Sequence, residues 1–344
     1  MSDDGRHISP QLGALSGEGS SQRIDQPAEA YPSSPSVWSE RSSRSFESDE
    51  PTYYDRPLLK EAVWIWSVPA YFYVGGTAGA AAVLAASAHA LGRGEMDGLV
   101  RTCRWIAAIG GAVGTVFLIH DLGRPERFLH MLRVFRPTSA MSVGSWVLAG
   151  AASATMGSAL LSSQEGALGH LGDAAGYGAA LLGMPLAGYT AVLLSNTAVP
   201  VWQATRHSLP PLFIGSAMSG LASLFGLLPV DLNAREERTV HRFGIAGKVI
   251  DLAAMAAVES EAARVETVAK PLRQGVSGTL WKAAKALTAA SLALSLLSGK
   301  PGIRRKAAGV LGTAGALALR FAVFHAGKAS ARDPRASFRQ QRSS

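Results

Sequence analysis

The residues best suited to chemistry lie in a single stretch, His120-Asp121-Leu122-Gly123-Arg124-Pro125-Glu126-Arg127-Phe128. It follows an apolar run that ends at Ile119 and precedes another that begins at Met141. Its charge therefore lies where a membrane helix would leave the bilayer. Such a loop can bind an acidic or redox-active head group, and it can equally serve only to anchor a helix end. Within it, His120 and Asp121 can exchange protons, because histidine titrates near neutral pH and a carboxylate can accept its proton.

Tyr189 is a further candidate, because its hydroxyl lies in the middle of an apolar run and needs a hydrogen-bond partner there. Pro185 precedes it and frees a backbone carbonyl that could be this partner. The alternative partner is the carbonyl group of a buried ligand. The sequence leaves both interpretations open.

Aromatic side chains crowd the start of the first apolar run, where Trp64, Trp66 and Tyr71 are followed by Phe72 and Tyr73. An aromatic belt at the membrane interface accounts for this placement. The same side chains could instead form the wall of an entry for a flat ring.

Lys248 and Asp251 are ionisable residues inside an apolar run, where each costs about 2.5–3.5 kcal/mol on insertion scales. Because three positions separate them on one helix, they can face the same way and pair. They would form either a self-neutralising pair or one station of a proton path.

We expect no metal, haem or iron–sulfur centre in this chain. Cys103 is its only cysteine, whereas an iron–sulfur cluster needs about four cysteine ligands. Haem would need paired histidines on facing helices. His120 with His325, or His89 with His241, could be such a pair, but all four lie near the ends of apolar runs.

The composition predicts an all-α, polytopic membrane bundle. Of the 344 residues, 48% are hydrophobic and only 17% are charged, below the roughly 25% usual for soluble proteins. The net charge of +8 does not indicate nucleic-acid binding, because the basic residues stand in short blocks between apolar runs. That distribution is typical of membrane anchoring.

Eight apolar runs approach the roughly 20 residues that a membrane-spanning helix needs, although a count of seven stays open. The predicted spans are Trp64–Ala90, Val100–Ile119, Met141–Leu161, Ala174–Val199, Leu212–Val230, Phe243–Val258, Gly278–Leu297 and Ala307–Phe324. The sixth is short and charged, and the seventh begins with lysines. Small residues such as those of Gly110-Gly111-Ala112-Val113-Gly114 predict close helix packing in lipid.

Three segments are expected along the chain. Residues 1–54 are polar and rich in Ser, Gly and Pro, and such a segment is predicted to be a disordered tail because it cannot bury enough apolar surface. It lacks the apolar region of a signal peptide. Residues 55–328 would form the transmembrane domain and 329–344 a basic C-terminal tail. The distribution of basic residues slightly favours cytoplasmic termini.

The sequence resembles the NrfD family, the membrane subunits of polysulfide reductase and related complexes. The most specific resemblance is the His120–Phe128 stretch, continued by Arg136-Pro137-Thr138-Ser139-Ala140-Met141-Ser142-Val143-Gly144-Ser145-Trp146. The segments Tyr53–Pro57 and Trp64–Gly76 resemble the first helix of the family, and Asn196–Trp202 and Leu319–Lys328 lend support. The resemblance covers about Tyr53 to Pro334.

The resemblance implies an eight-helix subunit of the inner (cytoplasmic) membrane without a cofactor of its own. It would exchange electrons between a quinone, either menaquinone or ubiquinone, and a four-cluster ferredoxin-like iron–sulfur subunit. That partner would serve a molybdopterin catalytic subunit of the polysulfide reductase or formate dehydrogenase type.

Residue roles follow from this resemblance and the chemistry of quinol oxidation. His120 and Tyr189 would bond to the ring or shuttle its protons, and Asp121 would relay protons. The aromatic residues that would wall the ring are Trp64, Trp66 and Tyr71. The arginines that would hold the loop against the iron–sulfur partner are Arg124, Arg127 and Arg136.

Two other functions remain possible from the sequence. A bare membrane anchor would tolerate replacement of Tyr189, His120 and Asp121 without loss of electron transfer. A small-solute or ion transporter would be favoured by broken spans in two inverted halves, and the sequence has no clear internal repeat.

Overall fold

The computed structural model describes residues 6–8, 15–17, 59–92, 94–122, 124, 126–297 and 301–337. The chain divides into two units, 1–53 and 54–344. In the first, the strands Arg6–Ile8 (β1) and Leu15–Gly17 (β2) pair antiparallel, with His7 opposite Ser16. The predicted disordered tail otherwise lies outside the described residues.

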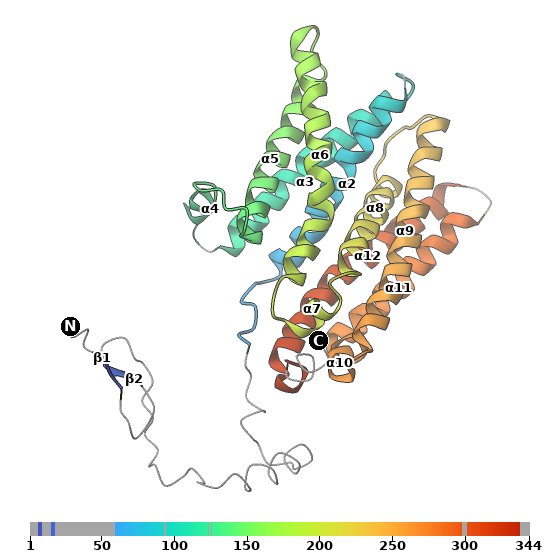
Figure 1. Ribbon diagram of the computed structural model, residues 1–344. Helices are drawn as coiled ribbons and strands as arrows, with labels where there is room; N and C mark the ends of the chain where they lie inside the picture. The colour runs from blue at the N-terminus through green and yellow to red at the C-terminus, as the bar shows by residue number, and fades with distance from the viewer. Residues whose placement is uncertain are drawn as a thin grey trace. The chain divides into compact units, whose positions relative to one another are not determined.

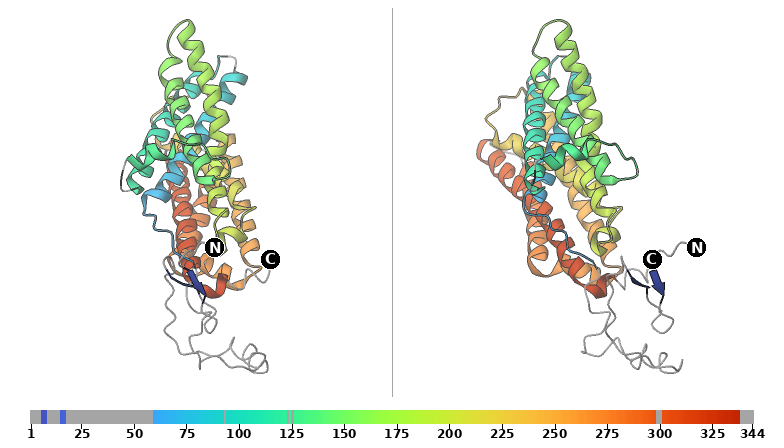
Figure 2. Two further views of the ribbon diagram at one scale, coloured as in Figure 1. Left: turned by 60° about the vertical axis from the view of Figure 1, so that its left-hand side comes forward. Right: turned by 90° about the vertical axis from the view of Figure 1, so that its left-hand side faces the viewer.

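The second unit is a bundle of long helices (Figures 1 and 2). The long helices are α2 (Ser67–Gly92), α3 (Asp97–Asp121), α5 (Ala140–Leu161), α6 (Ala167–Ser195), α8 (Leu209–Leu227), α9 (Ala234–Ala262), α11 (Gly275–Leu296) and α12 (Pro301–Arg332). The short helices are α4 (Glu126–Met131), α7 (Pro200–Ala204) and α10 (Glu266–Arg273). Each predicted span corresponds in order to one long helix.

Six of these helices, α2, α3, α5, α6, α8 and α12, are long and apolar enough to cross a membrane. The sequence predicted eight such spans. The other two helices, α9 and α11, form as expected but carry more polar sequence. In α11, Lys285 pairs with Glu259 of α9 at 2.8 Å. The two less apolar helices therefore satisfy part of their charge by contacting each other.

Helix α9 begins nine positions before the predicted span, because its start is fixed by a capping box. The Asn233 side chain accepts hydrogen bonds from the backbone of Arg235 and Glu236, and Glu236 accepts one from the backbone of Asn233 at 2.8 Å. Glu236 also accepts a 2.7 Å bond from Leu99 N at the start of α3. This buried carboxylate thus joins two helix ends.

Helix α2 is central, since it packs against α3, α6, α8 and α12. Its contact with α6 brings two backbones together. A Cβ added to Gly183 would lie 2.8 Å from Gly79 O, and one added to Gly79 would lie 2.5 Å from Gly183 O. This is the close packing of small residues that the sequence predicted.

We predict that Gly183→Ala destabilises the bundle by about 1–3 kcal/mol, since overpacking forces the backbones apart. The matched control is Gly178→Ala on the same helix, where an added Cβ meets nothing within 4 Å. Thermal unfolding of the purified protein in detergent measures both. Equal unfolding temperatures for the two variants would contradict the proposed backbone contact.

Candidate functional site

One cavity brings together four of the residues predicted to act. It has a volume of about 140 Å³ and is lined by Trp64, Tyr71, Asp121 and Tyr189. The rest of its wall is mainly apolar and comes from the facing ends of α2, α3, α5 and α6, with Phe128 and Met131 of α4 beside them. A cavity of about 150 Å³ can hold a benzene ring. The cavity therefore has room for one six-membered ring, with any tail lying outside.

Tyr189 places an unpartnered hydroxyl at this cavity. Its hydroxyl oxygen is buried beside the backbone of Gly144, and no hydrogen bond of normal geometry joins it to the described residues. The ring lies against Gly144 of α5, where a Cβ would overlap it. Pro185 lies inside a continuous α6, and the carbonyl that it frees does not accept from Tyr189. Burying a hydroxyl without a hydrogen-bond partner costs about 1–3 kcal/mol of free energy. A ligand that accepts a hydrogen bond from this hydroxyl would therefore bind favourably.

Asp121 faces the cavity from the last residue of α3. Its Oδ1 accepts a 3.1 Å hydrogen bond from Ile65 N, just before α2. Among the described residues, its second carboxylate oxygen has no hydrogen bond and can accept a proton. Asp121 thus ties the entry to α2 with one carboxylate oxygen and leaves the other available at the cavity wall.

The segment 59–66, here called the entry segment, carries Trp64 to the cavity. The Trp64 ring stacks on Trp202 at 6.2 Å, and Trp64 O accepts a 3.2 Å bond from Lys328 of α12. Glu61 pairs with Lys328 at 3.3 Å and with Arg332 at 2.6 Å. The entry segment is therefore held to the end of α12 by charge as well as by ring packing.

His120 and Trp66 lie beside the cavity rather than in its wall. Trp66 is 56% exposed, and its ring lies 6.0 Å from that of His120 and 5.7 Å from that of Phe117. His120 is exposed as well. The predicted ring-binding set is thus divided, because successive residues at the end of α3 point in different directions around the helix. Asp121 faces inward and His120 outward.

The loop between α3 and α5 presents charge to its surroundings. Arg124 and Arg136 are exposed. Arg136 N donates a 3.0 Å bond to Ser142 Oγ, which ties the loop to the first turn of α5. Arg127 belongs to α4, and its side chain lies outside the described part of the structure. The predicted partner-binding arginines are therefore accessible where they are described.

The residues that line the cavity all lie in the part of the chain, residues 58–330, that matches a known family model. The family is described as polysulphide reductase, NrfD. The chain belongs to the NrfD family. The family resemblance predicted from the His120–Phe128 stretch is thereby confirmed. No curated protein matches the sequence. As an NrfD protein with several apolar helices, it is a multi-pass membrane protein of the kind that associates with other redox subunits.

Elsewhere in this NrfD protein, the predicted pairing of Lys248 with Asp251 is wrong. Lys248 donates a 2.8 Å bond to Ser295 of α11 instead. The described residues contain no ion pair for Asp251, and both its carboxylate oxygens are buried without a hydrogen bond. Three positions place two side chains on one helix face, but here the long lysine reaches a different neighbouring helix.

The charge that interacts with Asp251 is Arg320 of α12, a residue to which the sequence assigned no role. Arg320 is 1% exposed. Its guanidinium lies 3.9 Å from the centre of the Phe213 ring and donates a 2.8 Å bond to Phe213 O. A cation inside an apolar span was the available signal. Its partner could not be identified without the packing of α8, α9 and α12.

We predict that Glu61→Gln loosens the entry segment without unfolding the bundle. The Arg332 hydrogen bond, together with Lys328, holds the pKa of Glu61 below its usual range. A lowered pKa in the folded state means that this contribution is present at neutral pH and is lost as the pH falls through the folded-state value. The effect is small, about 0.2–1 kcal/mol, because the Arg332 side chain is 70% exposed and the Glu61 and Lys328 side chains are still reached by solvent.

Hydrogen exchange of the entry segment measures this effect. Faster exchange of the amides near Glu61 is expected in Glu61→Gln at pH 7, and in the wild type only under acidic conditions. Glu95→Gln, which removes a carboxylate paired with Arg235 at the opposite end of α2, is the control. Unchanged exchange in Glu61→Gln would show that ring packing alone holds the segment.

Proposed function

We propose that this protein is the quinone-interacting membrane subunit of a multi-subunit oxidoreductase. The observation that carries the proposal is the unpartnered Tyr189 hydroxyl in a ring-sized cavity that Asp121 also lines. A quinone offers carbonyl oxygens that accept a hydrogen bond, and a quinol offers hydroxyl protons. Tyr189 and Asp121 supply the complementary donor and acceptor.

Quinol oxidation releases two protons and two electrons, and the residues of the cavity divide this task. Tyr189 donates to one ring oxygen and orients the ring against Tyr71 and Trp64. The free oxygen of Asp121 accepts the two ring-hydroxyl protons one at a time, one with each electron that leaves. His120, exposed and adjacent in the chain, passes each proton to solvent before the next is taken. In the direction of quinone reduction the same groups carry protons inward.

Electrons must leave to a partner, because we expect no redox centre in this chain. The cavity lies beside the loop that carries Arg124 and Arg136. A four-cluster ferredoxin-like subunit bound to this loop would bring an iron–sulfur cluster near the ring, and that subunit would serve a molybdopterin enzyme of the polysulfide reductase or formate dehydrogenase type. Placement in the inner membrane with cytoplasmic termini completes the proposal.

The test is binding of a short-tailed quinone to the purified protein. Quenching of the protein's tryptophan fluorescence measures this binding. Tyr189→Phe is expected to weaken saturable binding about tenfold, because the loss of one buried hydrogen bond costs about 1.4 kcal/mol. Its unfolding temperature should not fall, since the hydroxyl makes no hydrogen bond of normal geometry to the described residues. Tyr177→Phe, on the exposed surface of α6, is the matched control.

Asp121→Asn completes the same experiment. Asparagine retains an oxygen that can accept from Ile65 N, so the entry segment should stay in place while the proton acceptor is lost. We expect quinol oxidation by the complete complex to fall more than quinone binding does. Absence of saturable binding in the folded wild type would favour a bare anchor or a transporter instead.

We further propose that Asp251 is a station of a proton path. The support for this proposal is that both carboxylate oxygens of Asp251 are buried without a hydrogen bond and that the interacting cation is the buried Arg320. Lys248 would stand at the path's outer end. In vesicles that contain the complete complex, Asp251→Asn should lower the number of protons moved per electron pair while leaving quinone binding intact. A proton yield equal to that of the wild type would exclude Asp251 from such a path.

A further inference from the structure

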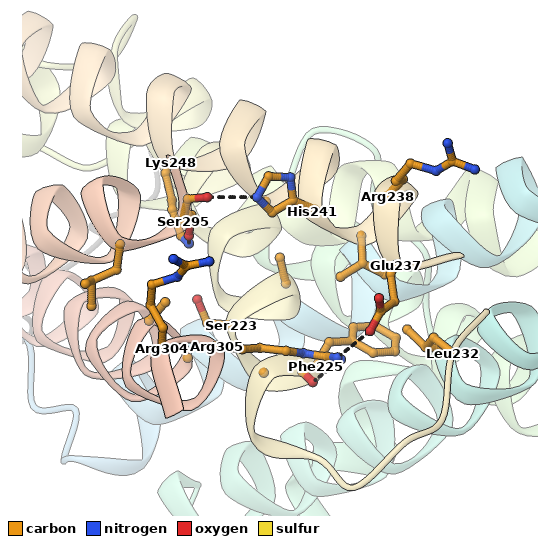
Figure 3. Close-up of a pocket in the computed structure, with 17 residues that line it drawn as sticks. Ser223, Phe225, Leu232, Glu237, Arg238, His241, Lys248, Ser295, Arg304 and Arg305 are labelled. Atoms are coloured by element: carbon orange, nitrogen blue, oxygen red, sulfur yellow. Dashed lines mark hydrogen bonds and ion pairs between the residues drawn. The ribbon is translucent and has the colours of Figure 1, made fainter. Parts of the chain in front are cut away.

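A second cavity, of about 300 Å³, lies between α8, α9, α11 and α12 (Figure 3). Its cationic and titratable lining residues, here called the basic pocket, are Arg238, His241, Lys248, Arg304 and Arg305. Following the helices along the chain places it at the start of α9 and α12 and the end of α11. The quinone cavity lies at the start of α2 and the end of α6. The two sites therefore occupy opposite ends of the bundle.

The basic pocket carries an excess of positive charge. Its single carboxylate, Glu237, already pairs with Arg305 at 2.7 Å. Arg305 also donates a 3.2 Å bond to Phe225 O, which fixes the pair at the pocket wall. Arg238 and Lys248 remain without a carboxylate partner among the described residues. In Figure 3, Arg304 extends toward the part of the pocket where Lys248 and Ser295 lie.

Lys248 is the decisive residue, since it is only 4% exposed. Its ammonium group makes one hydrogen bond to the described residues, to Ser295 Oγ at 2.8 Å. Two of its three protons therefore lack an acceptor among the residues that the structure describes. His241 Nε2 donates to Ser295 O at 2.9 Å, so two side chains of α9 hold Ser295 of α11 (Figure 3). A buried ammonium without a counter-charge is costly, and a bound anion would remove that cost.

We propose that the basic pocket binds the phosphate group of an anionic phospholipid. A phosphate offers several acceptor oxygens to Lys248 and the arginines, and charge-assisted bonds of this kind are the strong ones. Basic pockets between membrane helices suit anionic lipid head groups. Apolar residues at the same pocket, including Phe225, Leu232 and Leu294, can contact the glycerol and the first part of the acyl chains. The proposal is independent of the quinone site, with which it shares no lining residue.

The pocket fits a lipid better than a second quinone. A quinone ring is neutral and would leave the positive charges uncompensated. A free phosphate ion shares the charge of the lipid head group but leaves the apolar lining without a contact. The two sources of phosphate can be separated by experiment.

The test follows the unfolding temperature of the full-length protein in neutral detergent at constant ionic strength. The probes are a short-chain phosphatidylglycerol, the corresponding phosphatidylcholine, and inorganic phosphate. Phosphatidylglycerol is expected to raise the unfolding temperature saturably, and phosphatidylcholine is not. Lys248→Met should raise the half-saturating phosphatidylglycerol concentration about tenfold, the effect of losing one charge-assisted bond.

Controls separate the pocket from general surface charge. Arg304→Gln tests the pocket without altering the buried lysine, and its expected effect is also a loss of several-fold. Arg242→Gln on α9 and Lys306→Gln on α12 remove the same charge from exposed positions outside the pocket, and both should bind phosphatidylglycerol as the wild type does.

The outcomes decide the proposal. Saturable stabilisation by phosphatidylglycerol that only the pocket variants weaken supports a lipid site. If inorganic phosphate stabilises the protein equally well, the pocket recognises phosphate itself and the lipid source is wrong. Equal stabilisation by phosphatidylcholine, or equal losses in the exposed controls, would overturn the site altogether.

Discussion

The backbone contact between α2 and α6 at Gly79 and Gly183 is the constraint on which the cavity lined by Tyr71, Asp121 and Tyr189 depends. Tyr71 precedes Gly79 on α2, and Tyr189 follows Gly183 on α6. At 1.5 Å per residue the two tyrosines lie about 12 Å and about 9 Å from this contact, toward the same end of the bundle. Fixing the contact therefore fixes the height at which both phenols meet. A side chain at either glycine would change the spacing of the cavity walls.

The second half of the bundle uses the same packing to bury charge. A Cβ on Gly215 of α8 would lie 2.7 Å from Asp251 N on α9, so the two backbones touch where Asp251 enters the interior. Arg320 reaches this region from α12 and is held there by the carbonyl and ring of Phe213. Close helices thus leave little room for these side chains to reach solvent. The Asp251 carboxyl and the Arg320 guanidinium stay buried because close helix packing encloses them. Neither α9 nor α12 is polar along its whole length.

Sequence patterns predicted the helices well, because apolar runs and small-residue spacing report directly on membrane helices. The start of α9 was missed, since it depends on the side chains of Asn233 and Glu236 rather than on hydropathy. Within the candidate site, Asp121, Tyr189, Tyr71 and Trp64 were predicted to act together, and they line one cavity. The outward direction of His120 depends on how α3 is rotated about its own axis, because adjacent residues on a helix face different sides. The sequence does not determine this rotation. The partner of Lys248 depends on the position of α11, which is equally unspecified by local sequence.

The two ends of the bundle differ in chemistry, and the difference follows from which helix ends meet there. At one end, the apolar starts and ends of α2, α3, α5 and α6 enclose a mainly apolar cavity with one unpartnered hydroxyl and one carboxylate. At the other, the starts of α9 and α12 bring basic residues together around a single paired acid. A neutral ring that gives up protons suits the first, and an anion suits the second. Lys248 belongs to the basic pocket, yet it lies one helical turn from Asp251. An anion bound at the pocket would therefore lower the electrostatic potential near Asp251 and favour its protonated form. Anion binding at the basic pocket would in this way affect proton uptake by Asp251 on α9.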